Sequence, residues 1–173
     1  MVWEWIVKKA NSSTSTIKDT ISPNISINIP FKMINPSIET KIESFSNFSK
    51  VIDSLKITIS SIVLIVDLEN CGEKSIQDIE FQKLCRDNGI IVICIFARLL
   101  PEDPIPYLLI KREDLHRDSA DEGIRRIIYY LVDHLKHDNI GLITKDHFGQ
   151  NMRDSLLETN NSLHLFLNIT EFK

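Results

Sequence analysis

The sequence predicts an α/β fold in which a mainly parallel sheet lies between two layers of helices, with an N-terminal extension before it. Short runs of β-branched apolar residues, such as Ile62–Val66 and Ile90–Phe96, have the composition of strands buried on both faces. Single helical patterns separate these runs, as in right-handed βαβ units. A chain of 173 residues suits about one domain. These observations together predict a three-layer α/β/α architecture.

The elements are expected to alternate after residue 60. Apolar runs predict strands at Ile62–Val66, Ile90–Phe96, Tyr107–Ile110, Ile140–Thr144 and Leu163–Leu167. Apolar residues at spacings of three and four predict helices at Lys74–Asp87, Asp121–Lys136 and His147–Glu158. The first of these helices should stop at Asn88-Gly89, because glycine commonly follows the last helical residue.

Residues 1–60 differ from the rest and are expected to form an N-terminal arm and an amphipathic helix, while residues 61–173 form the α/β domain. Val2–Val7 and Ile25–Phe31 alternate as half-exposed strands do. A helix is expected from the N-cap Ser37 to Leu55, since the apolar residues between them recur at three- and four-residue steps. Two roles stay open for this region: docking on the sheet, or contact in a homo-oligomer or larger complex.

Composition narrows the class of protein. The net charge of -4 argues against sequence-independent adhesion to duplex nucleic acid. No apolar run approaches the ~18 residues of a membrane span, so no membrane partner is expected. Cys71, Cys85 and Cys94 form no Cys-x-x-Cys pair, which predicts reduced thiols and no zinc site. These features favour an intracellular protein, either cytoplasmic or nuclear.

Acidic residues follow or precede elements at three separate places in the chain. Asp67 ends the first buried strand with Asn70 shortly after it, the cluster Asp118-Ser-Ala-Asp121-Glu122 begins a helix, and Asp146 follows the strand Ile140–Thr144. In a parallel sheet these positions meet at the carboxyl edge, where ligands bind. Carboxylates gathered in this way repel one another unless a hard cation neutralises them, which suits Mg²⁺ or Mn²⁺.

Each acid also has a purely structural explanation. Ser119-x-x-Glu122 fits a capping box, in which two side chains satisfy the first backbone N–H groups of a helix. Asp146 could act only as the N-cap of the helix from His147, and Asp67 could be a turn residue. Their joint placement at one edge nevertheless favours a site, because three unrelated caps would not be expected to converge.

Three segments resemble the motifs of the PIN-like nucleases, in particular the NYN branch. They are Val66-Asp-Leu-Glu-Asn70, Asp118 to Gly123, and Ile143-Thr-Lys-Asp146-His-Phe148, and the last is most similar to the NYN domains of CCCH zinc-finger RNA-decay nucleases. The resemblance covers about Ile62 to Leu167. It implies that Asp67, Asp121 and Asp146 are metal ligands, directly or through water, that Asn70 orients them, and that Asp118 or Glu122 is an additional acid.

The chain departs from that family pattern at two positions. Phe148 stands where many NYN domains have a second aspartate, and the glutamate of the central helix in PIN domains has no secure match here, Glu80 being only a candidate. A reduced acid set is compatible with a catalytically weak or inactive protein.

The first functional hypothesis is a metal-dependent endoribonuclease that hydrolyses phosphodiesters in single-stranded or looped RNA with Mg²⁺ or Mn²⁺. Basic residues near the acids are candidates for contact with phosphate, and two histidines flank the acids: Lys145, Arg125, Arg126 and Arg153, with His116 and His147. The second hypothesis is a PIN-like scaffold that binds RNA or protein without catalysis. A phosphohydrolase of another family is a weaker third, because the chain has no Asp-x-Asp pair and no Gly-rich phosphate loop.

Overall fold

The computed structural model describes residues 41–98, 105–114, 116, 118–159, 161, 163–166 and 168–172. The two strands expected at Val2–Val7 and Ile25–Phe31 lie outside the described residues. Within the described part of the chain, no helix is long and apolar enough to cross a membrane.

The described strands form one six-stranded sheet in which every pairing is parallel. Their order across the sheet is β1-β4-β3-β2-β5-β6, so β2 lies at the centre. The chain adds β3 and β4 on one side of β2 and then crosses to add β5 and β6 on the other. The strands are β1 Lys41–Ser44, β2 Ile62–Asp67, β3 Ile90–Phe96, β4 Leu108–Lys111, β5 Ile140–Ile143 and β6 Leu163–Phe166.

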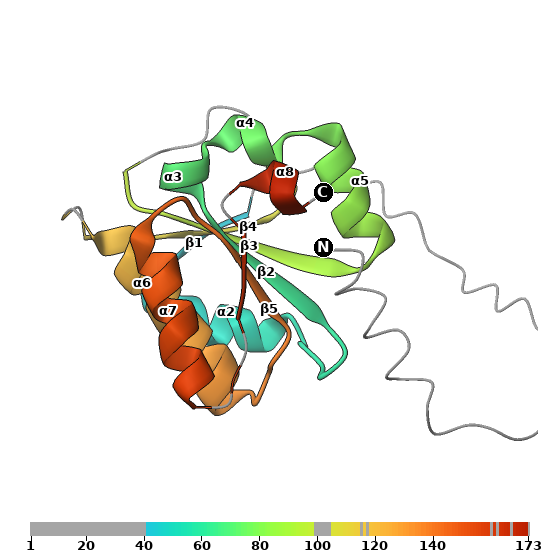
Figure 1. Ribbon diagram of the computed structural model, residues 1–173. Coiled ribbons are helices and arrows are strands. Elements are labelled where there is room, and N and C mark those ends of the chain that lie inside the picture. The colour runs from blue at the N-terminus through green and yellow to red at the C-terminus, as the bar shows by residue number, and fades with distance from the viewer. Residues whose placement is uncertain are drawn as a thin grey trace, which may run out of the picture.

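Helices cover both faces of this sheet, as predicted (Figure 1). One face carries α2 Phe48–Ser54, α6 Ser119–Tyr129, the π-helical turn η2 Tyr130–His134 and α7 His147–Glu158. The other carries α3 Leu68–Cys71, α4 Glu73–Ile76, α5 Ile79–Asp87 and α8 Ile169–Phe172. A short 3₁₀ turn, η1 Phe45–Asn47, leads from β1 into α2.

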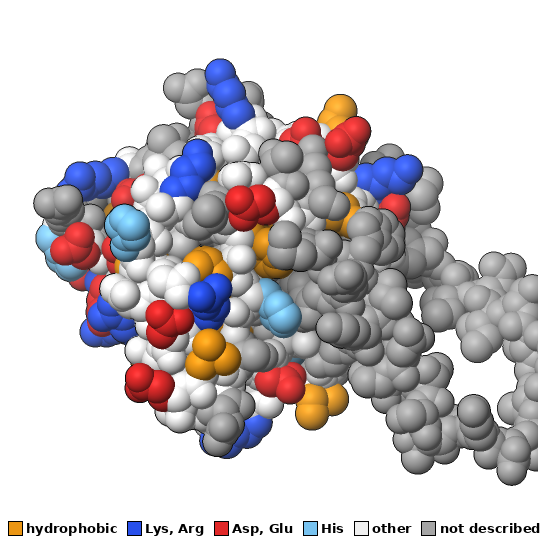
Figure 2. All heavy atoms as spheres, viewed as in Figure 1, with side chains coloured by type: hydrophobic (Ala, Val, Ile, Leu, Met, Phe, Trp, Pro, Cys, Tyr) orange, Lys and Arg blue, Asp and Glu red, His pale blue; other side chains and the backbone are white. Residues whose placement is uncertain are grey.

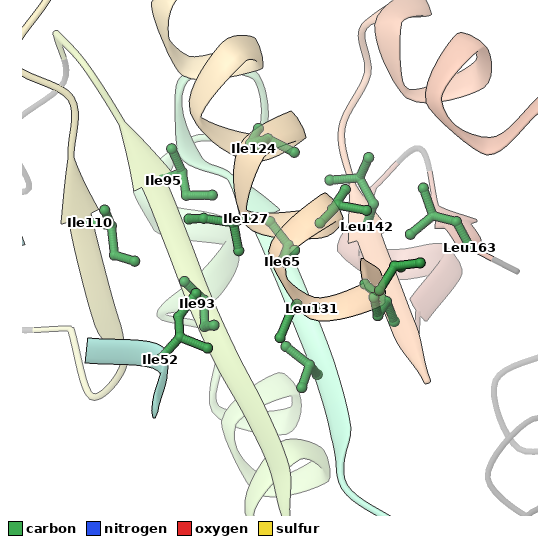
Figure 3. Close-up of a cluster of buried hydrophobic side chains, with 14 of the residues drawn as sticks. Ile52, Ile65, Ile93, Ile95, Ile110, Ile124, Ile127, Leu131, Leu142 and Leu163 are labelled. Atoms are coloured by element: carbon green, nitrogen blue, oxygen red, sulfur yellow. The ribbon is translucent and has the colours of Figure 1, made fainter. Parts of the chain in front are cut away.

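The core explains why α6 lies where it does. Its residues Ile124 and Ile127 face the sheet residues Ile65, Ile93 and Ile95 (Figure 3), and all five side chains are fully buried. Burying a side chain of this size stabilises a fold by about 1.5–3 kcal/mol. This packing fixes the body of α6 on the sheet and brings its first turn to the carboxyl edge.

Several predicted elements are confirmed closely. The strand Ile90–Phe96 and the helix His147–Glu158 have the predicted bounds. The helix predicted to stop at Asn88-Gly89 does so, since α5 ends at Asp87 and Gly89 adopts a positive φ of 61°. The long helix begins slightly earlier than predicted, at Ser119, and becomes π-helical from Tyr130.

The helix predicted from Ser37 to Leu55 is wrong at its start. Lys41–Ser44 instead forms β1, which pairs with β4, and the α-helix begins only at Phe48. Lys-Ile-Glu-Ser also alternates with the period of a strand, and the edge of β4 offers it backbone partners that a sequence pattern does not show. The described part of the first sixty residues therefore packs on the same sheet as the later elements.

The helix predicted from Lys74 to Asp87 is two helices. The chain leaves the first at Gln77, and Asp78 begins the second by accepting a hydrogen bond from the Phe81 backbone N–H at 2.8 Å. Aspartate is favoured at such N-caps because its carboxylate satisfies a backbone donor that has no partner within the helix.

Candidate functional site

Asp67 lies at the point where the strand order reverses, between β2 and β5. Its side chain is fully buried. Its Oδ1 accepts a hydrogen bond from the Asn70 backbone N–H at 3.3 Å, and its Oδ2 accepts one from Asn70 Nδ2 at 2.5 Å. Burial raises the pKa of Asp67, and the hydrogen bonds from Asn70 and Thr144 oppose that rise because they stabilise the ionised form. Asn70 therefore holds the Asp67 carboxylate in place.

Thr144 also belongs to the candidate site, although the sequence analysis did not single it out as a site residue. It follows β5, is fully buried, and donates a hydrogen bond from Oγ1 to Asp67 Oδ2 at 2.8 Å. The same oxygen accepts the Asp146 backbone N–H at 3.2 Å. One hydroxyl thus joins the acid at the end of β2 to the acid that follows β5. The only sequence signal for it was the small hydroxyl residue in the last motif.

Asp146 is exposed and precedes α7. Its Oδ1 accepts the Phe148 backbone N–H at 3.3 Å, which makes it the N-cap of this helix. The structural role considered from the sequence is therefore present. It does not exclude a second role, because Oδ2 has no hydrogen bond among the described contacts.

Asp121 lies in the first turn of α6 and is partly buried. Its pKa is raised to about 6, first by burial and then by the negative charges of Asp67, Asp146 and Asp118. Arg125 acts in the opposite direction. Because charges influence a pKa mainly at short range, this pattern places acids from three separate segments at one edge of the sheet.

The capping box considered for Ser119 and Glu122 is not formed. The N-cap of α6 is Asp118, which makes no side-chain cap hydrogen bond, and the Ser119 hydroxyl donates to the Asp114 carbonyl at 2.6 Å. Glu122 forms ion pairs with Arg126 at 2.9 Å and with Arg125 at 3.7 Å. A capping box therefore does not account for this acidic cluster, whereas the helix dipole still favours Asp121 and Glu122, which lie in the first turn.

An open hollow at the start of α6 is lined by His116, Asp118, Asp121, Glu122 and Arg125. The hollow brings together Asp121, which the sequence predicts as a metal ligand, and Arg125, which it predicts to contact the substrate. It is partly polar and exposed, so a charged ligand could reach it without displacing core side chains.

The other basic candidates are placed differently. Lys145 is exposed beside Asp146, and its positive charge acts to lower the pKa of Cys71. Burial outweighs that influence and raises the pKa of Cys71 to about 12, so this thiol is not activated. Arg153 lies within α7 and contacts Asp154 at 3.6 Å, and it does not line the hollow at α6.

The donor chemistry of this edge fits a hard divalent cation, because carboxylates predominate and neither thiolate nor imidazole groups form a ligand set. Among the residues that the structure describes, however, no group of three or more His, Cys, Asp or Glu side chains is arranged to hold a metal ion. Asp67 is engaged with Asn70 and Thr144, and Asp146 with the first turn of α7. The residue types fit the ion, while the arrangement is not that of a closed coordination shell.

No protein-family model matches the chain, and no curated protein matches it well enough to indicate a relationship. The resemblance to NYN domains therefore depends on the motif residues of the sequence alone.

Proposed function

We propose that the protein is a Mg²⁺- or Mn²⁺-dependent endoribonuclease of the PIN-like, NYN type. The observation that carries the proposal is the raised pKa of Asp121, caused first by burial and then by the charges of Asp67, Asp146 and Asp118. These negative charges add to burial in disfavouring the ionised form of Asp121, and a bound cation would favour that form again. Their position at the reversal of strand order supports a ligand site there.

Asp67, Asp121 and Asp146 would hold the cation, partly through water, since Mg²⁺ usually keeps several waters in proteins. When bound, the ion would polarise a phosphoryl oxygen and lower the pKa of a water molecule. Asn70 and Thr144 would keep Asp67 oriented through the hydrogen bonds described above. Asp118 would add negative charge at the rim of the site.

Lys145, which is exposed beside Asp146, and Arg125, which lines the hollow at α6, would attract the phosphates of a substrate. Figure 2 shows acidic and basic side chains interspersed over the visible face, without one continuous basic area. Tight duplex binding depends on many phosphate contacts, so this surface favours a short single-stranded or looped RNA segment. Three further points remain predictions from the sequence: phosphate contact by Arg153, an intracellular location, and assembly into a homo-oligomer or larger complex.

A second candidate function is a scaffold that binds RNA or protein without cleavage. The observation in its favour is that, in the described part of the chain, no three potential ligands form a metal-binding arrangement. The apolar Phe148 at the position of a second family acid supports the same alternative.

The decisive experiment uses the purified full chain and end-labelled single-stranded RNA, first with EDTA and then with excess Mn²⁺. Cleavage should disappear with the chelator, return with Mn²⁺ and be lost in Asp146→Asn. The matched control is Asp133→Asn, which removes an exposed carboxylate from η2 and should cleave at the wild-type rate.

Two other outcomes would count against the proposal. Cleavage that persists in EDTA would contradict the metal dependence. RNA binding without cleavage at any Mn²⁺ concentration would support the scaffold.

A further inference from the structure

Arg112 is a buried cation at the carboxyl edge to which the proposed function gives no role. It follows β4 directly and is only 5% exposed. Its backbone N–H donates to the Phe96 carbonyl at 2.8 Å, which continues the pairing of β3 with β4. A buried guanidinium is costly unless its donors and charge are satisfied, so its partners indicate what it is held against.

The guanidinium joins three segments of the chain. Its Nε donates to Ser119 Oγ at 3.3 Å, and its Nη2 donates to Asp114 Oδ2 at 2.8 Å. Its central carbon lies 4.4 Å from the centroid of the Phe45 ring, within the range of a cation–π contact. Arg112 therefore links the end of β4, the first turn of α6 and the turn that follows β1.

The stem of Arg112 lies directly against α6. A Cβ atom added to Gly123 would lie 2.9 Å from Arg112 Cδ, closer than such atoms approach, and 3.2 Å from Cγ, which is a tight contact. Gly123 is one turn after Ser119, so both residues lie on the same face of the helix. The side chain of Arg112 is thus held between the helix and the ring of Phe45.

This contact lies at the part of α6 that carries the acids. Asp118 precedes Ser119 as the N-cap, without a side-chain cap hydrogen bond, and Asp121 follows Ser119 in the first turn. The apolar residues that dock the body of α6 begin only at Ile124, apart from the small Ala120.

We propose that Arg112 is a positioning residue: by holding Ser119 and packing against Gly123, it sets the acids of α6 against Asp67. Through Phe45, the same contact makes that placement depend on the segment before β2. This inference rests on the proposed function, because it assumes that the acids of α6 help to bind the metal ion.

The contact itself is tested by a double-mutant cycle measured as the urea midpoint of unfolding. Alanine is normally the better helix former, so Gly123→Ala should raise the midpoint unless the methyl group meets Arg112. We expect Gly123→Ala to lower the midpoint in the wild type and to raise it in Arg112→Ala, where the stem is absent. The same change in both backgrounds would overturn the contact.

The positioning role is tested by isothermal titration with Mn²⁺ and by RNA cleavage in Arg112→Met, Arg112→Lys and Gly123→Ala. Partners that orient metal ligands typically change affinity or activity by about 10- to 100-fold, and we expect losses of this size in Mn²⁺ affinity and kcat for Arg112→Met. The KM for RNA should change little, and Arg112→Lys should lose less because it keeps the charge and one donor.

The control is Val92→Ala, which removes buried volume in the core on the other face of the sheet, away from α6. It should lower stability and leave Mn²⁺ affinity unchanged. If Arg112→Met also kept the wild-type affinity and kcat, Arg112 would be merely structural and the inference would be overturned.

Failure of the proposed function would be recognised separately, by a wild-type protein that neither binds Mn²⁺ nor cleaves RNA. Placement of the helix is then measured by the amide chemical shifts of residues 118–123. These shifts should change in Arg112→Lys but not in Val92→Ala. Unchanged shifts in both variants would overturn the inference without reference to metal or RNA.

Discussion

The two edges of the sheet differ sharply, although the same strands reach both. At the amino edge, strands begin with buried apolar residues such as Ile62, Ile90 and Ile140. The buried Asn139, just before β5, is a polar exception whose Nδ2 donates to the Ser61 carbonyl at 2.9 Å. A hollow there is lined mainly by apolar side chains, with Gln82 and Arg86 as its polar exceptions. At the carboxyl edge, by contrast, the strands end in or are followed by polar residues that are themselves buried: Asp67, Arg112 and Thr144.

The two edges contribute differently to the free energy of folding. Apolar side chains at the amino edge stabilise the fold by leaving water. The buried polar groups at the carboxyl edge must instead be compensated by hydrogen bonds, and Asp121 remains close to other negative charges. Substitutions at the carboxyl edge should therefore alter metal binding and cleavage, whereas those at the amino edge should alter stability alone.

The largest effect is expected for Asp67→Asn. The amide keeps the size of the side chain but removes the charge, and it cannot accept all the hydrogen bonds now donated by Asn70 and Thr144. RNA cleavage should fall to background, and leaving buried donors unsatisfied should cost about 1–3 kcal/mol in urea unfolding. Cleavage at the wild-type rate would show that this edge is not the active one.

A smaller effect is expected for Thr144→Val, which removes one hydroxyl and changes the shape little. The hydroxyl donates to Asp67 and accepts the Asp146 amide, so cleavage should slow by about tenfold. The stability loss in urea should be about 1 kcal/mol. Thr159→Val, at the end of α7, is the matched control, and an equal loss of rate in both variants would contradict the role of Thr144.

Asp121→Asn should raise stability in a pH-dependent way. The pKa of Asp121 in the folded protein is about 6, above its ordinary value of 3.8, so the folded state binds this proton more tightly than the unfolded state. Ionisation therefore lowers stability as pH rises through this window.

The thermal midpoint of Asp121→Asn should exceed that of the wild type above about pH 7, and the difference should vanish below about pH 4. Asp133→Asn, with its exposed carboxyl, provides the comparison. A variant that is equally stable or less stable than the wild type at neutral pH would show that ionisation of Asp121 does not destabilise the fold.

The smallest effect is expected at the amino edge, for Arg86→Met. Arg86 is exposed at the rim of the apolar hollow, and surface substitutions usually change stability by no more than about 0.5 kcal/mol. Cleavage and Mn²⁺ affinity should match the wild type. A large loss of either would remove the functional contrast between the two edges.

The sequence predicts the central strands and the longer helices because their patterns are local. Ile90–Phe96 is an uninterrupted apolar run, and His147–Glu158 follows an aspartate N-cap. The spacing of Ile42, Phe45 and Phe48 fits a continuous helix as well as a strand followed by a helix, so the sequence does not predict β1. Pairing with β4 decides between these alternatives, and that contact is distant in sequence.

The sequence predicts at which edge of the sheet the candidate site lies, but it does not predict the hydrogen bonds within the site. Topology alone brings Asp67, Asp121 and Asp146 to one edge, whereas the hydrogen bonds of Thr144 depend on the register of β2 with β5. Arg112 follows the strand predicted at Tyr107–Ile110, and the sequence around it does not mark it as a buried residue. It is buried because Phe45 and α6 cover it, and no local pattern encodes that burial.

A crystal structure of the full chain soaked in Mn²⁺ tests the central claim most directly. The account predicts an anomalous-scattering peak at the carboxyl edge, with Asp67, Asp121 and Asp146 reaching the ion directly or through water, and loss of the peak in Asp121→Asn. A peak elsewhere, or none at saturating Mn²⁺ in crystals where these side chains are ordered and accessible, would contradict it.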